Sequence, residues 1–221
     1  MNHSDQPDNE VQDIAQREAR VWEGSPYYQR AEEWTWLFWN EARPFARLFR
    51  KLDPRNLLEL ACGHGRHSEH VLLNFSDRIE TLTLMDVLQS NVDACRERLG
   101  ESPKLRFVCN SGTGFAPVAD GSISAIFCYD AMVHFHRDVV RSYLIDARRV
   151  LAPAGMALFH HSNHAVDPDS PFGSNPHARA YMSIPLFREM AEAAGLRVLA
   201  QEIIPWGNIP HLDGISLVQK A

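Results

Sequence analysis

The fold is decided by residues 57–68, which read LLELACGHGRHS: an apolar run, a turn of small residues, and the start of a helical pattern. This order predicts a buried β-strand, a tight loop and a helix, the unit that open α/β sheets use to bind nucleotide-like ligands. Gly63 and Gly65 allow the backbone to approach a ligand closely. The first amides of the next helix have no partner within it, and the helix dipole gives them a positive character.

Two carboxylates accompany this loop. Glu59 lies in the strand four residues before Gly63, where a carboxylate suits a ligand that carries a cation such as an amino group. Asp86 ends a second predicted strand over residues 80–86, about 20 residues after the loop. Nucleoside-binding α/β folds place an acid there to hold the ribose hydroxyls. Together the two acids predict a nucleoside-like ligand with a cationic group.

The pattern Glu59-x-Ala61-x-Gly63-x-Gly65 resembles the acidic-x-Gly-x-Gly-x-Gly signature of class I S-adenosylmethionine-dependent methyltransferases, with alanine in place of the first glycine. The family's other features follow in order: a third strand over 104–109, an Asp-Gly-Ser turn, a fourth strand over 123–128 and a Leu-x-Pro-x-Gly turn before the fifth strand, over 156–159. The resemblance covers residues 57–159. It implies an α/β fold: a seven-stranded, mostly parallel Rossmann-like methyltransferase sheet with helices on both faces, preceded by an aromatic helical extension.

The resemblance also implies that S-adenosylmethionine is the cofactor. The residues expected to bind it are Glu59, Ala61, Cys62, Gly63, His64, Gly65, Arg66, Asp86, Val87, Asn110, Ser111 and Tyr129. Among these, Asn110 and Ser111 follow the third strand and would flank the adenine, although a role in forming the turn is an equal alternative.

Candidates for acid–base chemistry follow the fourth and fifth strands, where open α/β sheets place their reactive groups. They are Asp130, His134, His160 and His161. Methyl transfer to a hydroxyl requires removal of its proton, and histidine suits that role because its ordinary pKa lies near working pH. The base is expected to be His134 or one of His160 and His161, which the sequence does not rank. A divalent metal on Asp130, Asn163 and these histidines is the alternative, and it is not favoured because imidazole selects softer metals than magnesium.

Composition and motifs limit the class of acceptor molecule and the cellular compartment that we expect. The formal net charge is 22 − 28 = −6, and the fourth strand lacks the Asn/Asp-Pro-Pro-Tyr/Phe motif, so a nucleic-acid acceptor is not expected. Neither a membrane span nor a signal peptide is evident, and the four cysteines lack zinc-type spacing, which favours a reduced, cytoplasmic protein. Tryptophans 22, 34, 36 and 39 and a polar loop after the fifth strand suit a polyhydroxylated acceptor.

The expected organisation is a disordered tail over 1–12 and one methyltransferase domain over 13–221, with a helical cap at 13–52 and a Rossmann-like core at 53–221. The predicted activity is O-methylation of a small polar acceptor, a saccharide or natural product, with the oligomeric state open and a homodimer included. One alternative is an NAD(P)-dependent Rossmann oxidoreductase, although Ser68 stands where its third glycine would be. The other is a non-catalytic cofactor-binding or scaffold protein.

Overall fold

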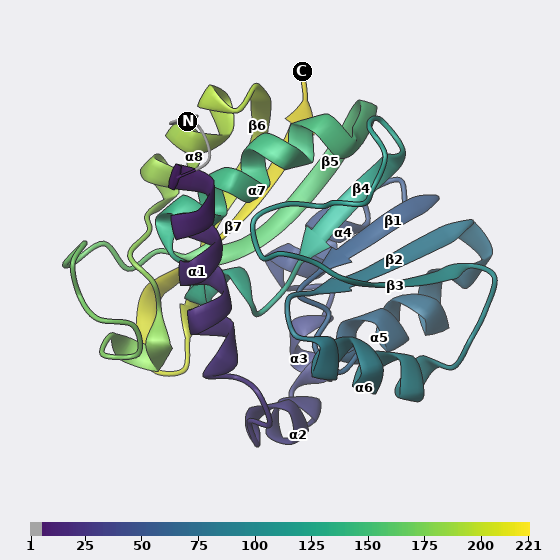
Figure 1. The fold of residues 1–221 in the computed structure, drawn as a ribbon, viewed down its shortest axis with the longest axis horizontal. Coiled ribbons are helices and arrows are strands. Elements are labelled where there is room, and N and C mark those ends of the chain that lie inside the picture. The colour runs from purple at the N-terminus through teal and green to yellow at the C-terminus, as the bar shows by residue number, and fades with distance from the viewer. Residues whose placement is uncertain (1–5) are drawn as a thin grey trace.

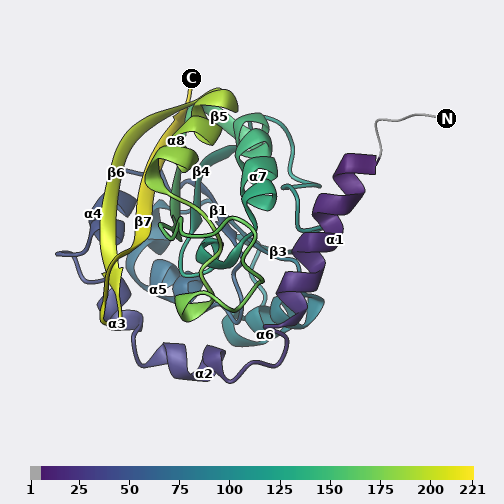
Figure 2. The ribbon, with the colours of Figure 1, turned by 90° about the vertical axis from the view of Figure 1, so that its left-hand side faces the viewer.

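A mixed sheet forms the centre of the protein, with helices on both of its faces (Figures 1 and 2). The computed structural model describes residues 6–221. Within that range the sheet has seven strands in the order β3-β2-β1-β4-β5-β7-β6. They are β1 Asn56–Leu60, β2 Thr81–Asp86, β3 Leu105–Cys109, β4 Ile123–Cys128, β5 Leu151–Ser162, β6 Leu196–Trp206 and β7 Ile209–Lys220. The first five strands are parallel and β7 is antiparallel to both neighbours, which confirms the predicted fold class.

The helices divide between the two faces because successive strand residues point to opposite sides. One core packs α1 Gln6–Arg20, α7 Arg137–Val150 and α8 Ile184–Ala193 against side chains such as Leu58 and Ile126. The other packs α3 Thr35–Phe38, α4 Pro44–Phe49, α5 Arg66–Phe75 and α6 Gln89–Leu99 against side chains such as Leu57 and Phe127. The short α2, Tyr27–Glu32, links α1 to these helices. Single 3-10 turns occur at Ser76–Arg78, Met132–His134 and Pro176–Ala178.

Two segments differ from the sequence predictions. The tail expected over 1–12 is helical from Gln6, because α1 packs its apolar side chains, among them Val11 and Ile14, against the core beside α7. Residues 1–5 lie outside the described residues. The turn expected at 153–155 lies within β5, where the pairing with β4 moves from Ile123–Leu151 to Ala125–Met156 and the intervening residues bulge out.

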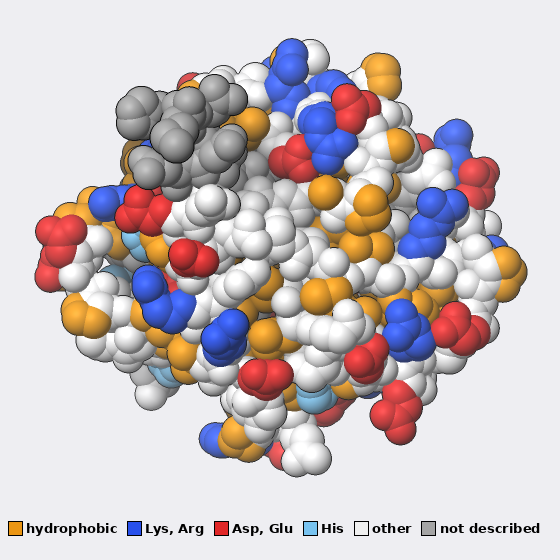
Figure 3. Space-filling view, viewed as in Figure 1, with side chains coloured by type: hydrophobic (Ala, Val, Ile, Leu, Met, Phe, Trp, Pro, Cys, Tyr) orange, Lys and Arg blue, Asp and Glu red, His pale blue; other side chains and the backbone are white. Residues whose placement is uncertain are grey.

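On the face drawn in Figure 3, basic and acidic side chains are interspersed rather than gathered by sign. No helix within residues 6–221 is both long and apolar enough to cross a membrane.

Candidate functional site

A cavity opens at the carboxyl ends of β1, β2 and β4, and the N-terminal helices cover it. Its atom-free space is about 1020 Å³ with the open mouth included. The glycine loop, Asp86, Asp130 and His134 line it on the sheet side, while α1 and α2 line the opposite side with Glu18, Trp22, Tyr27 and Tyr28. The helical cap expected before the core therefore forms one wall of the site.

The loop after β1 turns through three left-handed residues: Ala61 (φ 57°), Gly63 (φ 52°) and Gly65 (φ 80°). Ala61 adopts this conformation where the family signature has glycine. A side chain at Gly63 would lie 3.0 Å from the Tyr28 ring, so that ring covers the loop directly. Tyr28 also stacks on His64, with ring centroids 4.1 Å apart. Glycine is therefore required at Gly63 both by its φ and by the close approach of Tyr28.

Asp86 is held rigidly at the end of β2. Its Oδ2 accepts a hydrogen bond from Gly63 N at 3.0 Å, and its Oδ1 accepts from Leu88 N at 3.0 Å and Asn91 Nδ2 at 3.1 Å. Burial raises the pKa of this carboxyl, and these hydrogen bonds oppose that effect. Oδ2 accepts from one described donor only, so it keeps a lone pair at the cavity wall for a hydroxyl of a ligand.

Glu59 lies behind the loop and not on the cavity wall. It is 1% exposed and accepts a hydrogen bond from Ser68 Oγ in the first turn of α5. Burial raises the pKa of its carboxyl to about 8, although Ser68 and Arg66 act in the opposite direction. In this position Glu59 supports the loop through Ser68 and does not face the cavity in which a ligand would bind.

The polar residues after β3 do not line the cavity. Asn110 Nδ2 donates to Gly114 O at 2.7 Å and to the Tyr143 hydroxyl at 2.9 Å, while Ser111 is exposed. Gly112 lines the cavity instead, beside Val87 and under Ala15 of α1: a Cβ on Gly112 would lie 2.8 Å from the Ala15 Cβ. Of the residues after β2 and β3, Val87 and Gly112 therefore line the cavity, whereas Asn110 and Ser111, which were expected to flank the adenine, do not.

Asp130, at the end of β4, lies at the centre of a buried cluster of polar and charged side chains. Its Oδ2 accepts from the Tyr27 hydroxyl at 2.5 Å and from Arg66 Nη2 at 2.9 Å. Its Oδ1 is buried and has no hydrogen-bond partner among the described residues. Arg66 also donates to Ala31 O at 2.7 Å and lies 4.8 Å from the centre of the Phe38 ring. One carboxylate oxygen is therefore left for a donor that residues 6–221 do not supply.

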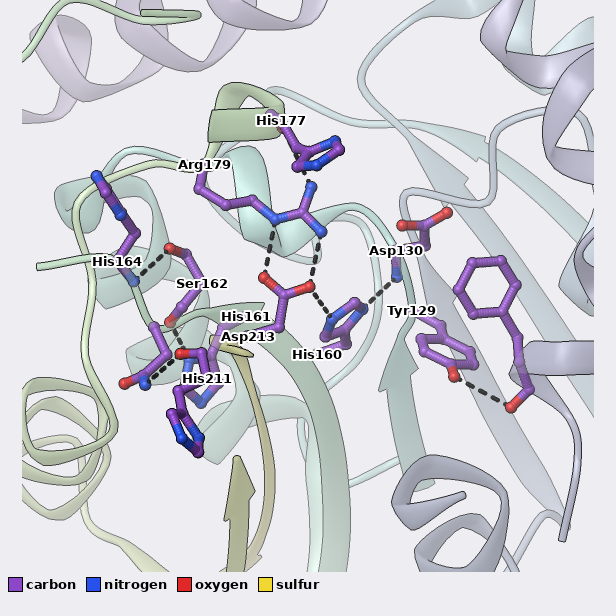
Figure 4. A network of polar contacts seen from close by, with 12 residues as sticks. Tyr129, Asp130, His160, His161, Ser162, His164, His177, Arg179, His211 and Asp213 are labelled. Atoms are coloured by element: carbon purple, nitrogen blue, oxygen red, sulfur yellow. Dashed lines mark hydrogen bonds and ion pairs between the residues drawn. The ribbon is translucent and has the colours of Figure 1, made fainter. Parts of the chain in front are cut away.

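His160 stands behind this cluster in a fully paired network (Figure 4). Its Nδ1 accepts from Asp130 N at 3.1 Å, so the proton is on Nε2, which donates to Asp213 Oδ2 at 3.0 Å. Arg179 donates to both oxygens of Asp213, at 2.8 and 2.6 Å. Burial opposes ionisation of Asp213, but His160 and Arg179 hold its pKa far below the ordinary value. With both ring nitrogens engaged, this geometry does not support His160 as the base.

His161 does not line the cavity and stacks on Phe187 of α8, with centroids 4.1 Å apart. Its nitrogens bond Ser162 O and Ser216 Oγ, both at 2.8 Å. Burial lowers the pKa of this histidine to about 4. His161 is a packed core residue, and the expectation that it acts as a base is not supported either.

His134 is the histidine that lines the cavity. Its Nδ1 donates to Ala178 O at 2.9 Å, and its ring packs on Trp22 at 4.4 Å. Nε2 has no described hydrogen-bond partner. Burial, with a smaller effect of Arg179, lowers the pKa of His134 to about 4, so the ring is neutral at pH 7 and Nε2 can accept a proton.

The residues proposed as metal ligands do not converge. Asn163 Oδ1 accepts from Ile184 N at 3.0 Å and its Nδ2 donates to His211 O at 2.8 Å, so its side chain is committed away from Asp130. Across residues 6–221, no group of three or more histidine, cysteine or acidic side chains is placed to hold a metal ion.

The sequence predicts an aromatic segment that includes Tyr27 and Tyr28, but it assigns these tyrosines no individual role. Arg179 belongs to the polar loop expected to suit the acceptor, and it is instead buried against Asp213, a residue to which the sequence assigns no role. A charged residue within an apolar strand is a signal of a buried ion pair. Tyr129, expected at the cofactor, does line the cavity, but its hydroxyl donates to Phe38 O at 3.0 Å.

Comparison with known proteins agrees with this architecture. Residues 57–155 match the family model described as "Methyltransferase domain". A curated relative, malonyl-[acyl-carrier protein] O-methyltransferase 1 of Ilyobacter polytropus, is 32% identical over 62 residues, which are 28% of this chain and 22% of the relative. The match therefore spans about a fifth of the relative's length.

Solved structures share the fold. A chain of the Haloferax volcanii complex between the Trm112 methyltransferase activator and a protein assigned as a methyltransferase has a TM-score of 0.67 at 15% identity, covering 90% of this chain and 96% of that one. A SAM-dependent methyltransferase from Aquifex aeolicus has a TM-score of 0.61 at 13% identity, covering 83% and 93%. Residues 57–155 therefore match a methyltransferase domain, and the solved structures share the fold of most of the chain.

Proposed function

We propose that this chain, in which residues 57–155 form a methyltransferase domain, is an S-adenosylmethionine-dependent enzyme that methylates a hydroxyl oxygen of a small acceptor. The observation that carries the proposal is the single cavity that joins the glycine loop and Asp86 to Asp130 and His134. Oxygen as the acceptor atom is in keeping with the name of the curated relative, an O-methyltransferase.

The described residues fit the cofactor. Gly63 permits close approach of the loop, and the free lone pair on Asp86 Oδ2 suits a ribose hydroxyl. Val87 and Gly112 line the same cavity as Asp86 and give the adenine an apolar wall. When bound, S-adenosylmethionine supplies a methyl group activated by a sulfonium. The chain contributes binding, orientation and exclusion of water by α1 and α2, and orientation accounts for much of the rate in such displacements.

Asp130 is the residue best placed to take the proton of the acceptor hydroxyl. During transfer of the methyl group, the O–H proton of the acceptor would pass to Asp130 Oδ1, the buried oxygen without a partner among the described residues. Tyr27 and Arg66 fix the carboxylate through its other oxygen. His134 is the second candidate because its Nε2 is unpaired at the same cavity.

Methyl transfer from labelled S-adenosylmethionine to a panel of hydroxylated acceptors, sugars and natural products included, tests the activity. Asp130→Asn is expected to lower turnover by about 100-fold or more while affinity for S-adenosylhomocysteine stays within about threefold. Asp120→Asn, at an exposed carboxylate, is the control and keeps full turnover.

Three outcomes contradict parts of the proposal. Full turnover of Asp130→Asn with loss of turnover in His134→Gln would move the base to His134. Loss of S-adenosylhomocysteine binding in Asp130→Asn would place that carboxylate on the cofactor instead. Binding of a nicotinamide nucleotide in place of S-adenosylhomocysteine would overturn the function. Circular dichroism establishes that each variant is folded.

A further inference from the structure

We propose that a second cavity binds the acceptor, and that the acceptor is an aromatic ring carrying a hydroxyl and a carboxylate. The proposal rests on the methyl transfer proposed above. This acceptor cavity lies between α3, the start of α4 and the turn from β6 to β7, with atom-free space of about 1380 Å³ including its mouth. Its walls include Phe38, Phe45, Trp34, Trp206 and Arg43.

The walls of the acceptor cavity favour a flat ring. Phe38 stacks on Trp206, with centroids 5.4 Å apart and planes 20° from parallel. Phe45 stacks on Tyr129 at 3.6 Å and 7°. Trp34 stands at the rim and is 39% exposed, which is unusual for so large an apolar side chain. Trp206 and Trp34 are the partly exposed aromatic walls of the cavity, and aromatic walls gain most from an aromatic ligand.

The charge of the acceptor cavity favours an anion. Arg43 lines it, is half-buried, and makes no ion pair or side-chain hydrogen bond with residues 6–221. Unlike Arg43, two neighbouring arginines form ion pairs: Arg66 with Asp130 and Arg47 with Glu202. No acidic side chain lines the cavity within the described range. A guanidinium fork without a partner recognises a carboxylate through two parallel hydrogen bonds.

The position of the acceptor cavity connects it to the transfer site. Tyr27 and Tyr129 line both cavities, so the two share a wall. Tyr27 donates to Asp130 Oδ2 from that wall, and Asp130 Oδ1 has no partner among the described residues. A ring in the acceptor cavity with its carboxylate on Arg43 would direct a hydroxyl at its far end towards this junction. An anion site at Arg43 and a proton acceptor at Asp130, joined by an aromatic cavity, therefore favour a hydroxyaryl carboxylate over a sugar.

Calorimetric titration with 4-hydroxybenzoate, in the presence of S-adenosylhomocysteine, tests the proposal. The wild-type protein is expected to bind this probe at least tenfold more tightly than neutral 4-hydroxybenzamide. Arg43→Gln is expected to remove that preference, lowering affinity for the acid at least tenfold and for the amide less than twofold. Arg47→Gln is the matched control, because Arg47 is exposed and already paired, and it keeps the preference.

The outcomes separate this inference from the proposed function. Equal binding of acid and amide, or equal affinity of wild type and Arg43→Gln for the acid, would overturn the inference. So would methylation of a sugar by a protein that does not bind 4-hydroxybenzoate, although the proposed function would then stand. Arg43-dependent binding of the acid without any methyl transfer would leave the acceptor cavity in place and refute the proposed function.

Discussion

Replacing Asp213 by asparagine is expected to destabilise the protein severely. Asp213 is fully buried and accepts hydrogen bonds from Arg179, itself 3% exposed, and from His160. An amide can present only one accepting oxygen, and its NH₂ group would face donors of Arg179 and His160. Breaking a buried pair in this way leaves an uncompensated guanidinium and costs about 3–5 kcal/mol. For a chain of this size that corresponds to a fall in Tm of roughly 6–20 °C.

Urea unfolding followed by circular dichroism measures this loss in the free energy of unfolding. Glu202→Gln is the matched control, because Glu202 faces Arg47 at 2.6 and 2.7 Å at a largely solvated position. Its loss should cost less than about 1 kcal/mol. The reasoning is refuted if Asp213→Asn also costs less than about 1 kcal/mol. The double variant Asp213→Leu with Arg179→Met should recover part of the stability, because it removes both charges together.

Two further predictions concern the cofactor and pH. Asp86→Ala should weaken binding of S-adenosylhomocysteine by about 1–3 kcal/mol, the range for a lost hydrogen-bonded polar partner, and unchanged calorimetric affinity would remove Asp86 from the ribose. Burial lowers the pKa of His161 from its ordinary 6.5 to about 4, so between these values the unfolded chain binds a proton that the native protein does not. The stability that His161 contributes is thus complete above about pH 6.5 and is lost as pH falls towards 4. His161→Gln should therefore lose less stability than wild type between about pH 7 and pH 5 in urea unfolding, and equal losses would contradict the assignment.

The fold could be predicted from the sequence because its signals are local. The strand expected at 123–128 has the observed bounds, and the strand expected at 80–86 lies at Thr81–Asp86. Each of these depends on an apolar run within a few residues. The bulge at 153–155 depends on pairing with β4, which no local pattern encodes.

The site was predictable only as far as the sheet topology dictates it. Parallel strands bring their carboxyl ends to one edge, so Asp86, Asp130 and His134 meet at one cavity as expected. Which side chains at this edge remain free to bind a ligand depends on hydrogen-bond partners that are remote in the sequence. Asn110 is occupied by Tyr143, 33 residues away, and His160 by Asp213, 53 residues away. Such pairings follow from packing and not from the motif.

The strand order has a consequence for how the chain is made. β7 lies between β5 and β6, so β6 has no strand to pair with until β7 exists. During synthesis the ribosome completes the glycine loop, the parallel strands and β6 while the outer edge of β5 is still open. An open strand edge can pair with strands of other chains. The edge of β5 therefore stays open in the nascent protein until residues 209–220, which form β7, have emerged from the ribosome. A chain interrupted within the turn from β6 to β7 would keep its parallel sheet and aggregate through β5.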